Sequence, residues 1–224
     1  MTLIQLGLPD HTTLTCAAVL FDMDGVLVDS AAVIEQNLRG WAGEHGLDAD
    51  HVIAVCPGRT LAELVAEVAP FLDARAEAQR LLEQDISNTD RLTACPGAEH
   101  LIRQLPESVW AVVTSGHYPV AVTRLTHTRL PIPDVLITAD DVSTGKPAPE
   151  GYLTAASRLG VEPRDCVVIE DAPAGLHAAK AAGMRAIAIA GREGGPFAPY
   201  DHRIESLSSI KVLHIDTTPT VPER

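Results

Sequence analysis

Two aspartates, Asp22 and Asp24, stand two positions apart directly after a short apolar run over residues 17–20. Such a run is typical of a strand buried on both faces of a parallel sheet. It places both carboxylates at the carboxyl end of that strand, where open α/β sheets bind their ligands. Gly25 lets the backbone turn sharply here, so the two carboxylates can converge. Carboxylates crowded in this way need a cation nearby, or one of them must hold a proton.

Further polar side chains follow other predicted strands. Thr114 and Ser115 come after one strand, Glu170 and Asp171 end another, and Lys146 lies in a loop. Parallel strands bring these groups to the same edge as the aspartate pair. Carboxylate oxygens without His or Cys suit Mg²⁺, and a lysine with a hydroxyl suits phosphoryl oxygens. Taken singly, Glu170-Asp171 could be an acidic pair at a helix N-terminus and Lys146 a solvated lysine. Their combination favours a site.

The elements that must position these residues alternate between strands and helices. The predicted strands span about 17–22, 109–114, 135–137, 166–170, 186–189 and 211–215. The predicted helices span about 97–105, 118–128, 150–159 and 174–182. Strands that alternate with helices predict an α/β fold, here a Rossmann-like doubly wound parallel sheet with helices on both faces.

Residues 31–92 interrupt this alternation, because their apolar positions recur only at helical spacing. Amphipathic stripes predict helices over 31–46, 61–68 and 74–86. We interpret residues 31–92 as an inserted small α-helical domain, and residues 1–30 together with 93–224 as the α/β core.

Three local features lie before this insert and at the two ends of its first helix. Residues 1–15 look like a loose lead-in or an edge extension of the sheet. Asp29 with Ser30 is expected to form the N-cap of the first inserted helix, because short polar side chains accept hydrogen bonds from the first free N–H groups of a helix. Gly46 is expected to end that helix as its C-cap.

The chain resembles the haloacid dehalogenase superfamily of phosphotransferases. The resemblance is specific because four motifs occur in the expected order, at residues 22–30, 113–115, 145–147 and 169–175. The insert after the first motif resembles the small helical cap of the subgroup that contains β-phosphoglucomutase and sugar-phosphate phosphatases. The resemblance covers about residues 16–190 and implies an α/β core with a cap domain.

The resemblance also implies catalytic roles for four residues. Asp22 would be the nucleophile that forms an aspartyl phosphate, and this splits one phosphoryl transfer into two steps. Asp24 would protonate the leaving oxygen and then deprotonate the attacking water. Thr114 would donate a hydrogen bond to a phosphoryl oxygen. Lys146 would neutralise charge on the nucleophile and on the phosphoryl group.

A magnesium site is implied beside the nucleophile. The resemblance assigns Mg²⁺ to Asp22, to the backbone carbonyl of Asp24, and to Glu170 and Asp171. This set offers oxygen ligands alone, which is the chemistry that Mg²⁺ prefers.

Candidate substrate-binding residues lie near this edge and in the insert. Ser115 and His117 follow the second motif, and Arg59 starts a helix after the Pro57-Gly58 loop, where caps of this type carry a specificity loop. Glu35 and Asn37 are further pocket candidates. Each could instead serve locally, Ser115 as a cap and Arg59 as a solvated residue.

The leading hypothesis is a Mg²⁺-dependent phosphatase of small phosphomonoesters, namely sugar or polyol phosphates. One alternative is a β-phosphoglucomutase-type mutase, but Ile34 stands where such mutases have a histidine. A second alternative is a catalytically idle phosphosugar-binding protein. Phosphonatases of this superfamily form a Schiff base with a lysine of the cap. This chemistry is disfavoured here because residues 31–92 contain no lysine.

Composition restricts the partners. The net charge of −13 and pI near 5.0 argue against nucleic acid and anionic membranes, which attract clustered Lys and Arg. No apolar stretch reaches the length of a membrane span. The four cysteines form no C-x-x-C pair, which is typical of reduced thiols in a cytoplasmic protein. We therefore expect a cytoplasmic monomer or weak homodimer whose partner is a small phosphorylated metabolite.

Overall fold

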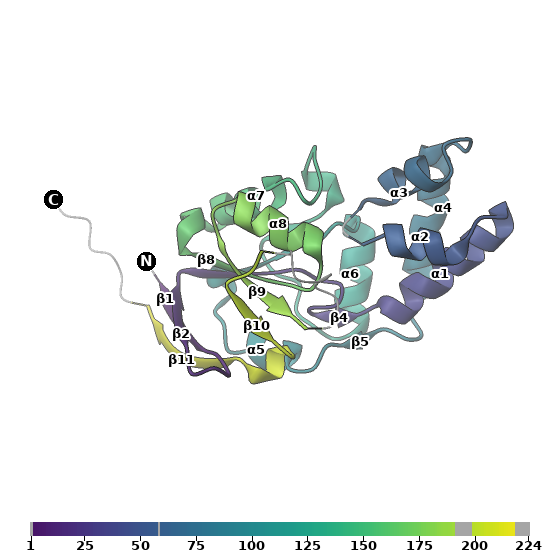
Figure 1. Cartoon of the computed structure of the whole chain (residues 1–224). Coiled ribbons are helices and arrows are strands. Elements are labelled where there is room, and N and C mark those ends of the chain that lie inside the picture. Colours follow the sequence, from purple (N-terminus) through teal and green to yellow (C-terminus); the bar gives the residue numbers. More distant parts are fainter. Residues whose placement is uncertain (1, 58, 191–198, 218–224) are drawn as a thin grey trace.

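A six-stranded parallel sheet forms the centre of the molecule, with strand order β10-β9-β8-β3-β6-β7 (Figure 1). The computed structural model describes residues 2–57, 59–190 and 199–217. The strands are β3 (Ala18–Phe21), β6 (Trp110–Val113), β7 (Leu136–Ile137), β8 (Cys166–Glu170), β9 (Arg185–Ile189) and β10 (His202–Ile204). The two central strands, β3 and β8, are buried at every position, as their continuous apolar sequences predict.

Helices cover both faces of this sheet, so the predicted doubly wound α/β fold is confirmed. They are α5 (Ala98–Ile102), α6 (Tyr118–His127), α7 (Glu150–Leu159) and α8 (Pro173–Ala181). Side chains of α5 and α6 pack with Phe21 and Ile169 on one face. Side chains of α7 and α8 pack with Leu20 and Val168 on the other. Neighbouring residues of one strand thus face opposite helix layers.

Four helices follow one another in the insert: α1 (Ala31–His45), α2 (Ala49–Val55), α3 (Leu61–Val68) and α4 (Ala74–Ser87). They form the helical unit at the right of Figure 1. The unit packs around a core of its own, which includes Leu38, Trp41, Val65 and Leu81. Two short strands, β4 (Val28–Asp29) and β5 (Thr93–Ala94), pair antiparallel where the chain enters and leaves the unit. The sequence pattern missed α2.

Local capping explains where several of these helices begin and end. The Asp48 and Asp73 side chains accept backbone N–H groups at the starts of α2 and α4. Thr60 and Glu63 form a reciprocal capping box at α3. Gly46 ends α1 in the left-handed conformation (φ 66°), as predicted.

The N-terminal residues correct the expectation of a loose lead-in or an edge extension. They form β1 (Leu3–Gly7) and β2 (Thr13–Cys16) of a separate antiparallel sheet, in which β1 lies between β2 and β11 (Lys211–Asp216). The predicted strand at 211–215 therefore exists but belongs to this second sheet. Ile4 and Leu6 alternate with exposed residues and join the main core.

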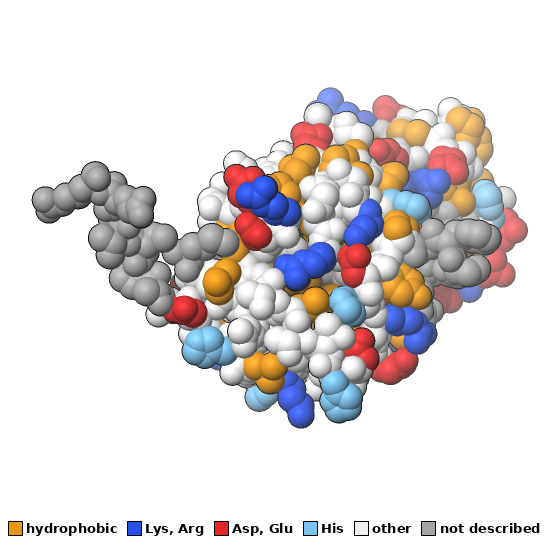
Figure 2. All heavy atoms as spheres, turned by 60° about the vertical axis from the view of Figure 1, so that its left-hand side comes forward, with side chains coloured by type: hydrophobic (Ala, Val, Ile, Leu, Met, Phe, Trp, Pro, Cys, Tyr) orange, Lys and Arg blue, Asp and Glu red, His pale blue; other side chains and the backbone are white. Residues whose placement is uncertain are grey.

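The remaining regular elements are short 3-10 turns at Glu107–Val109, Ala139–Asp141, Pro163–Asp165 and Leu207–Ser209. On the face shown in Figure 2, basic and acidic side chains are interspersed and neither kind gathers into a continuous patch. Within the described ranges, no helix combines the length and the apolar character needed to cross a membrane.

The separate core of the helical unit leads to a stability prediction. Leu81→Ala removes a side chain that is 1% exposed and should lower the free energy of unfolding by about 2–5 kcal/mol. The two tryptophans report the two regions, since Trp41 lies in the helical unit and Trp110 in β6. In single-tryptophan variants, urea titration should show a larger midpoint shift for Trp41 fluorescence. Leu153→Ala, at a half-exposed position, is the control. Equal shifts for both probes would contradict separate unfolding of the helical unit.

Candidate active site

Three neighbouring strands bring the predicted site residues to one edge of the sheet. Asp22 follows β3 directly, and Thr114 follows β6. Phe21 is in register with both Val112 and Ile169. The Asp22 N–H continues the ladder by donating to the Ile169 carbonyl at 3.0 Å. The strand ends therefore lie side by side, as the parallel sheet predicts.

Lys146 joins the nucleophile candidate to the carboxylates of the next strand. Its Nζ lies 2.6 Å from Asp22 Oδ1 and 2.6 Å from Glu170 Oε1, and it also donates to the Val113 carbonyl at 3.1 Å. Burial lowers the pKa of Lys146, but the charges of Asp22 and Glu170 more than reverse this and raise that pKa well above its usual value. The ammonium group is therefore charged at neutral pH.

Glu170 is fully buried, and both of its oxygens are occupied. Oε1 accepts from Lys146 and from the Tyr152 hydroxyl at 2.9 Å. Oε2 accepts from the backbone N–H groups of Asp171 and Ala172, each at 3.0 Å. These contacts surround the carboxylate with donors, which offsets the cost of burying its charge.

Two glycines make room for these carboxylates. A Cβ atom at Gly175, in the first turn of α8, would lie 1.5 Å from Glu170 Oε1. A Cβ atom at Gly25 would lie 1.9 Å from Asp171 Oδ2, and Gly25 has a φ of 87°. Side chains at either position would displace a carboxylate, so both glycines are required by close approach.

Asp22, Glu170 and Asp171 form a buried acidic cluster. One carboxylate oxygen from each lies within 4.8 Å of the others. Burial first, and then the nearby carboxylates, raise the pKa of Asp22 well above its usual value, although Lys146 opposes this shift. Three carboxylates against one ammonium leave a charge of −2 when all are ionised. The oxygen-only donor set and this charge fit a hard divalent cation.

The Asp24 side chain points to a different set of partners. Asp24 Oδ1 accepts from Ser30 Oγ and from the Arg124 guanidinium, each at 2.6 Å. This corrects the predicted cap of α1. Ser30 occupies the N-cap position, but its side chain makes no capping hydrogen bond, and Asp29 lies in β4 with its side chain exposed. The hydroxyl is used by Asp24 instead.

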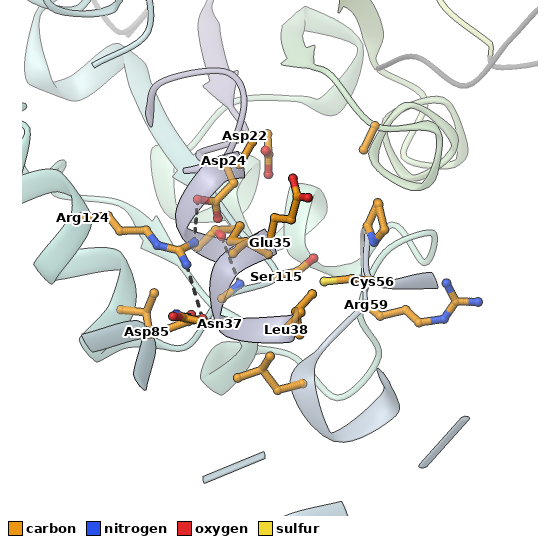
Figure 3. A pocket seen from close by; sticks show the side chains of 18 of the residues that line it. Asp22, Asp24, Glu35, Asn37, Leu38, Cys56, Arg59, Asp85, Ser115 and Arg124 are labelled. Carbon is orange, nitrogen blue, oxygen red and sulfur yellow. Dashed lines mark hydrogen bonds and ion pairs between the residues drawn. The ribbon is translucent and has the colours of Figure 1, made fainter. Parts of the chain in front are cut away.

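A cavity of about 460 Å³ lies against this edge of the sheet and is closed on the other side by the helical unit (Figure 3). Its lining is mixed, with carboxylates and Lys146 on the sheet side and apolar side chains such as Ile34 and Leu38 from α1. Asp22 and Asp24 are thus brought to one pocket together with residues as distant in the sequence as Lys146 and Asp171.

The predicted substrate-binding residues all line this cavity. Arg59 does so while its guanidinium is held by Glu67 (Nε to Oε2, 2.9 Å) and extends away from Asp22 and Asp24 in Figure 3. The His117 Nδ1 lies 2.6 Å from Asp140 Oδ1. Gly58, beside Arg59, lies outside the described residues.

The other two pocket candidates, Glu35 and Asn37, both have partners within the helical unit. Glu35 pairs with Arg39 at 2.8 Å on the exposed side of α1. Asn37 Nδ2 donates to Asp85 Oδ1 at 2.7 Å. Both residues line the cavity, as expected from their place on α1.

Sequence reasoning missed three polar residues of the site: Tyr152, Asp85 and Arg124. Tyr152 and Arg124 lie on the buried faces of α7 and α6. The sequence did hold a signal for these two residues. Each is a polar side chain on the helix face whose other buried positions, three or four residues away, are apolar. Asp85 gave no such signal, because α4 carries many charged residues.

The comparisons with known proteins agree with this geometry. A family model described as haloacid dehalogenase-like hydrolase matches residues 16–183. Hexitol phosphatase A of Escherichia coli is 40% identical over 182 residues, which cover 78% of this chain and 83% of that protein. Validoxylamine A 7'-phosphate phosphatase of Streptomyces hygroscopicus is 38% identical over 210 residues, covering 89% and 93%. A solved HAD hydrolase of family IA, variant 3, from Entamoeba histolytica has a TM-score of 0.74 at 25% identity, covering 87% and 95%.

The crowding at Glu170 gives a second prediction. Gly175→Ala should lower the free energy of unfolding by about 1–3 kcal/mol, because the new methyl group must displace a buried carboxylate. Gly40→Ala is the matched control. Gly40 lies in α1 with open space around it, so the same change should be neutral or stabilise by about 0.5–1 kcal/mol. Chemical unfolding of both variants measures the difference. Equal stabilities would contradict the close packing of Glu170 on α8.

Proposed function

The chain belongs to the haloacid dehalogenase-like hydrolase family, and from this premise we propose a Mg²⁺-dependent phosphatase that hydrolyses small sugar or polyol phosphates through an aspartyl phosphate. The protein is a phosphoric monoester hydrolase, like the phosphatases to which it is similar. The observation that carries the finer proposal is the Lys146 ammonium between Asp22 and Glu170, at the base of the cavity.

In the first step, an Asp22 carboxylate oxygen attacks the phosphorus atom and the bond from phosphorus to the ester oxygen breaks. Asp24 donates a proton to that oxygen, so the alcohol leaves neutral. In the second step, Asp24 removes a proton from water, which attacks the same phosphorus atom. The bond between phosphorus and Asp22 breaks and inorganic phosphate forms. Lys146 balances the negative charge at Asp22 in both steps.

Thr114 is suited to hold a phosphoryl oxygen. Its Oγ1 already accepts the Gly116 N–H at 3.0 Å, so its hydroxyl proton can be donated to a ligand. Ser115 and His117 lie next to it on the cavity wall and are proposed substrate contacts. Arg59 stays a predicted substrate contact. To bind the substrate, Arg59 would have to release Glu67, and His117 would have to release Asp140.

Mg²⁺ would be held by Asp22, by the Asp24 carbonyl and by Asp171. Glu170 was predicted as a further ligand. Because both of its oxygens already accept two hydrogen bonds each, we propose that it mainly orients Lys146 and completes the negative charge of the site. The bound cation would supply positive charge to the carboxylates and to the phosphoryl oxygens.

The substrate class follows from the cavity and the relatives. Polar groups of Asn37 and Asp85, from α1 and α4 of the helical unit, line one side of the cavity, where they suit the hydroxyl groups of a sugar or polyol. Hexitol phosphatase A and the glycerol-1-phosphate phosphohydrolases of Saccharomyces cerevisiae carry such substrates in their names. The oligomeric state, a monomer or weak homodimer, stays a prediction. A cytoplasmic location stays a prediction.

Asp22→Asn tests the mechanism. The amide is a poor nucleophile, so kcat should fall by more than about 10³-fold, with an unchanged circular dichroism spectrum. Asp134→Asn, the same change at an exposed position of the core, should keep wild-type activity. Phosphate release from a glycerol phosphate measures both variants. Substantial Mg²⁺-dependent turnover by Asp22→Asn would rule out the aspartyl phosphate.

A substrate panel tests the reaction class. Hexitol, hexose and glycerol phosphates should release phosphate when Mg²⁺ is present, and activity should disappear with EDTA and return with added Mg²⁺. β-Glucose 1-phosphate with a bisphosphate primer should give free phosphate. Conversion to the 6-phosphate without phosphate release would instead establish a mutase, and tight binding without turnover would establish an idle binding protein.

A further inference from the structure

Arg124 is a buried charge that the mechanism above does not use. It lies on α6 beside apolar residues such as Val120 and Leu125, and its side chain is 3% exposed. Its position on the sheet side of the cavity brings it into the site (Figure 3). A charged side chain at such a position needs an explanation, because arginine is rarely buried unless it is paired.

The guanidinium connects the two halves of the site. One amino nitrogen, Nη1, lies 2.6 Å from Asp24 Oδ1, and the other, Nη2, lies 3.3 Å from Asp85 Oδ2. Asp85 belongs to α4 of the helical unit, and its other oxygen accepts from Asn37 on α1. A continuous polar chain therefore runs from the proposed acid and base, through the core helix α6, to two helices of the insert (Figure 3).

Stability alone does not account for this arrangement. Among the described residues, the buried Arg124 Nε has no hydrogen-bond partner. A buried N–H group without a partner is costly, and apolar residues of similar volume often replace buried ion pairs without loss of stability. The pair is thus better explained by what it does to Asp24.

The contacts at Asp24 restrict how its carboxyl group can turn. Arg124 and Ser30 both bind Oδ1. Neither contact uses Oδ2, so this second oxygen can face a reacting group while the first is held from two directions. A fixed orientation of this kind is what proton transfer to a leaving group requires.

We propose that Arg124 is a positioning residue that orients Asp24 for proton transfer, and that Asp85 makes this orientation depend on the helical unit lying against the sheet edge. The inference rests on the proposed function, since it assumes that Asp24 is the acid. It adds a residue from α6 and one from α4 to the determinants of catalysis, and it gives the insert a part in proton transfer besides covering the cavity.

The leaving group separates this role from a structural one. An alkyl phosphate releases a strongly basic alkoxide and needs the proton from Asp24 as the bond breaks. p-Nitrophenyl phosphate releases a weakly basic phenolate and hardly needs it. Single-turnover experiments with enzyme in excess measure the rate at which the alcohol or nitrophenolate is released. For both esters, this rate reports the first step alone.

Arg124→Gln should slow alcohol release from glycerol phosphate by about 10²-fold and nitrophenolate release by less than about threefold. Asp85→Asn keeps the contact between Arg124 and Asp24 and removes only the charge on the helical unit, so it should slow alcohol release by about tenfold. Arg103→Gln, at an exposed ion pair of α5, is the control and should match the wild type.

Other outcomes would overturn the inference. Equal losses with both esters would mean a structural role for Arg124, and no loss with either would mean that Asp24 is oriented without it. A rise in KM for glycerol phosphate at unchanged kcat would make Arg124 a substrate contact instead. The Asp22→Asn variant tests the proposed function separately. If it still releases nitrophenolate, the proposed function fails, whatever the Arg124 variants show.

Discussion

The ion pairs of Lys146 with Asp22 and Glu170 are the interactions on which the site depends. Burying several carboxylates within a few ångströms is unfavourable unless donors and positive charge surround them. The fold provides this compensation with one ammonium group, the Tyr152 hydroxyl and two backbone N–H groups at the start of α8. The glycines at 25 and 175 then allow the carboxylates to lie this close to the backbone.

The parallel sheet explains why so much of this site was predictable. A strand that is buried on both faces must be apolar throughout, so β3, β6 and β8 are visible in the sequence as short apolar runs. The polar residues that follow the runs mark the carboxyl edge, because parallel strands end together. Asp22, Thr114 and Glu170 could therefore be placed side by side before any distance was known. Local patterns carried this information in full.

Contacts between distant segments carry no such local signal. β1 and β2 pair with each other as a short hairpin, and β1 also pairs with β11, which lies about 200 residues further along the chain. They were missed because an isolated short hairpin gives only a weak strand signal, and the strand that completes the sheet is far away in the sequence. Ser30 illustrates a different limit. Its type and position suit a helix cap. In the folded chain, however, its hydroxyl donates to Asp24 and makes no capping hydrogen bond. Arg124 and Asp85 likewise meet only in three dimensions.

The helical unit is attached to the core through the β4–β5 strand pair and contacts α6 through Asp85 and Arg124. The unit has its own apolar core around Trp41 and Leu81, so its internal packing does not require the sheet. The pairing of β4 with β5 fixes where it joins the core. Against that anchor, the contact of Arg124 with Asp85 at 3.3 Å joins the unit to the core helix α6 through buried, oppositely charged groups, and hydrogen bonds between such groups are directional. Arg124 also contacts Asp24, so the proposed acid is the point at which the placement of the unit would act on the reaction.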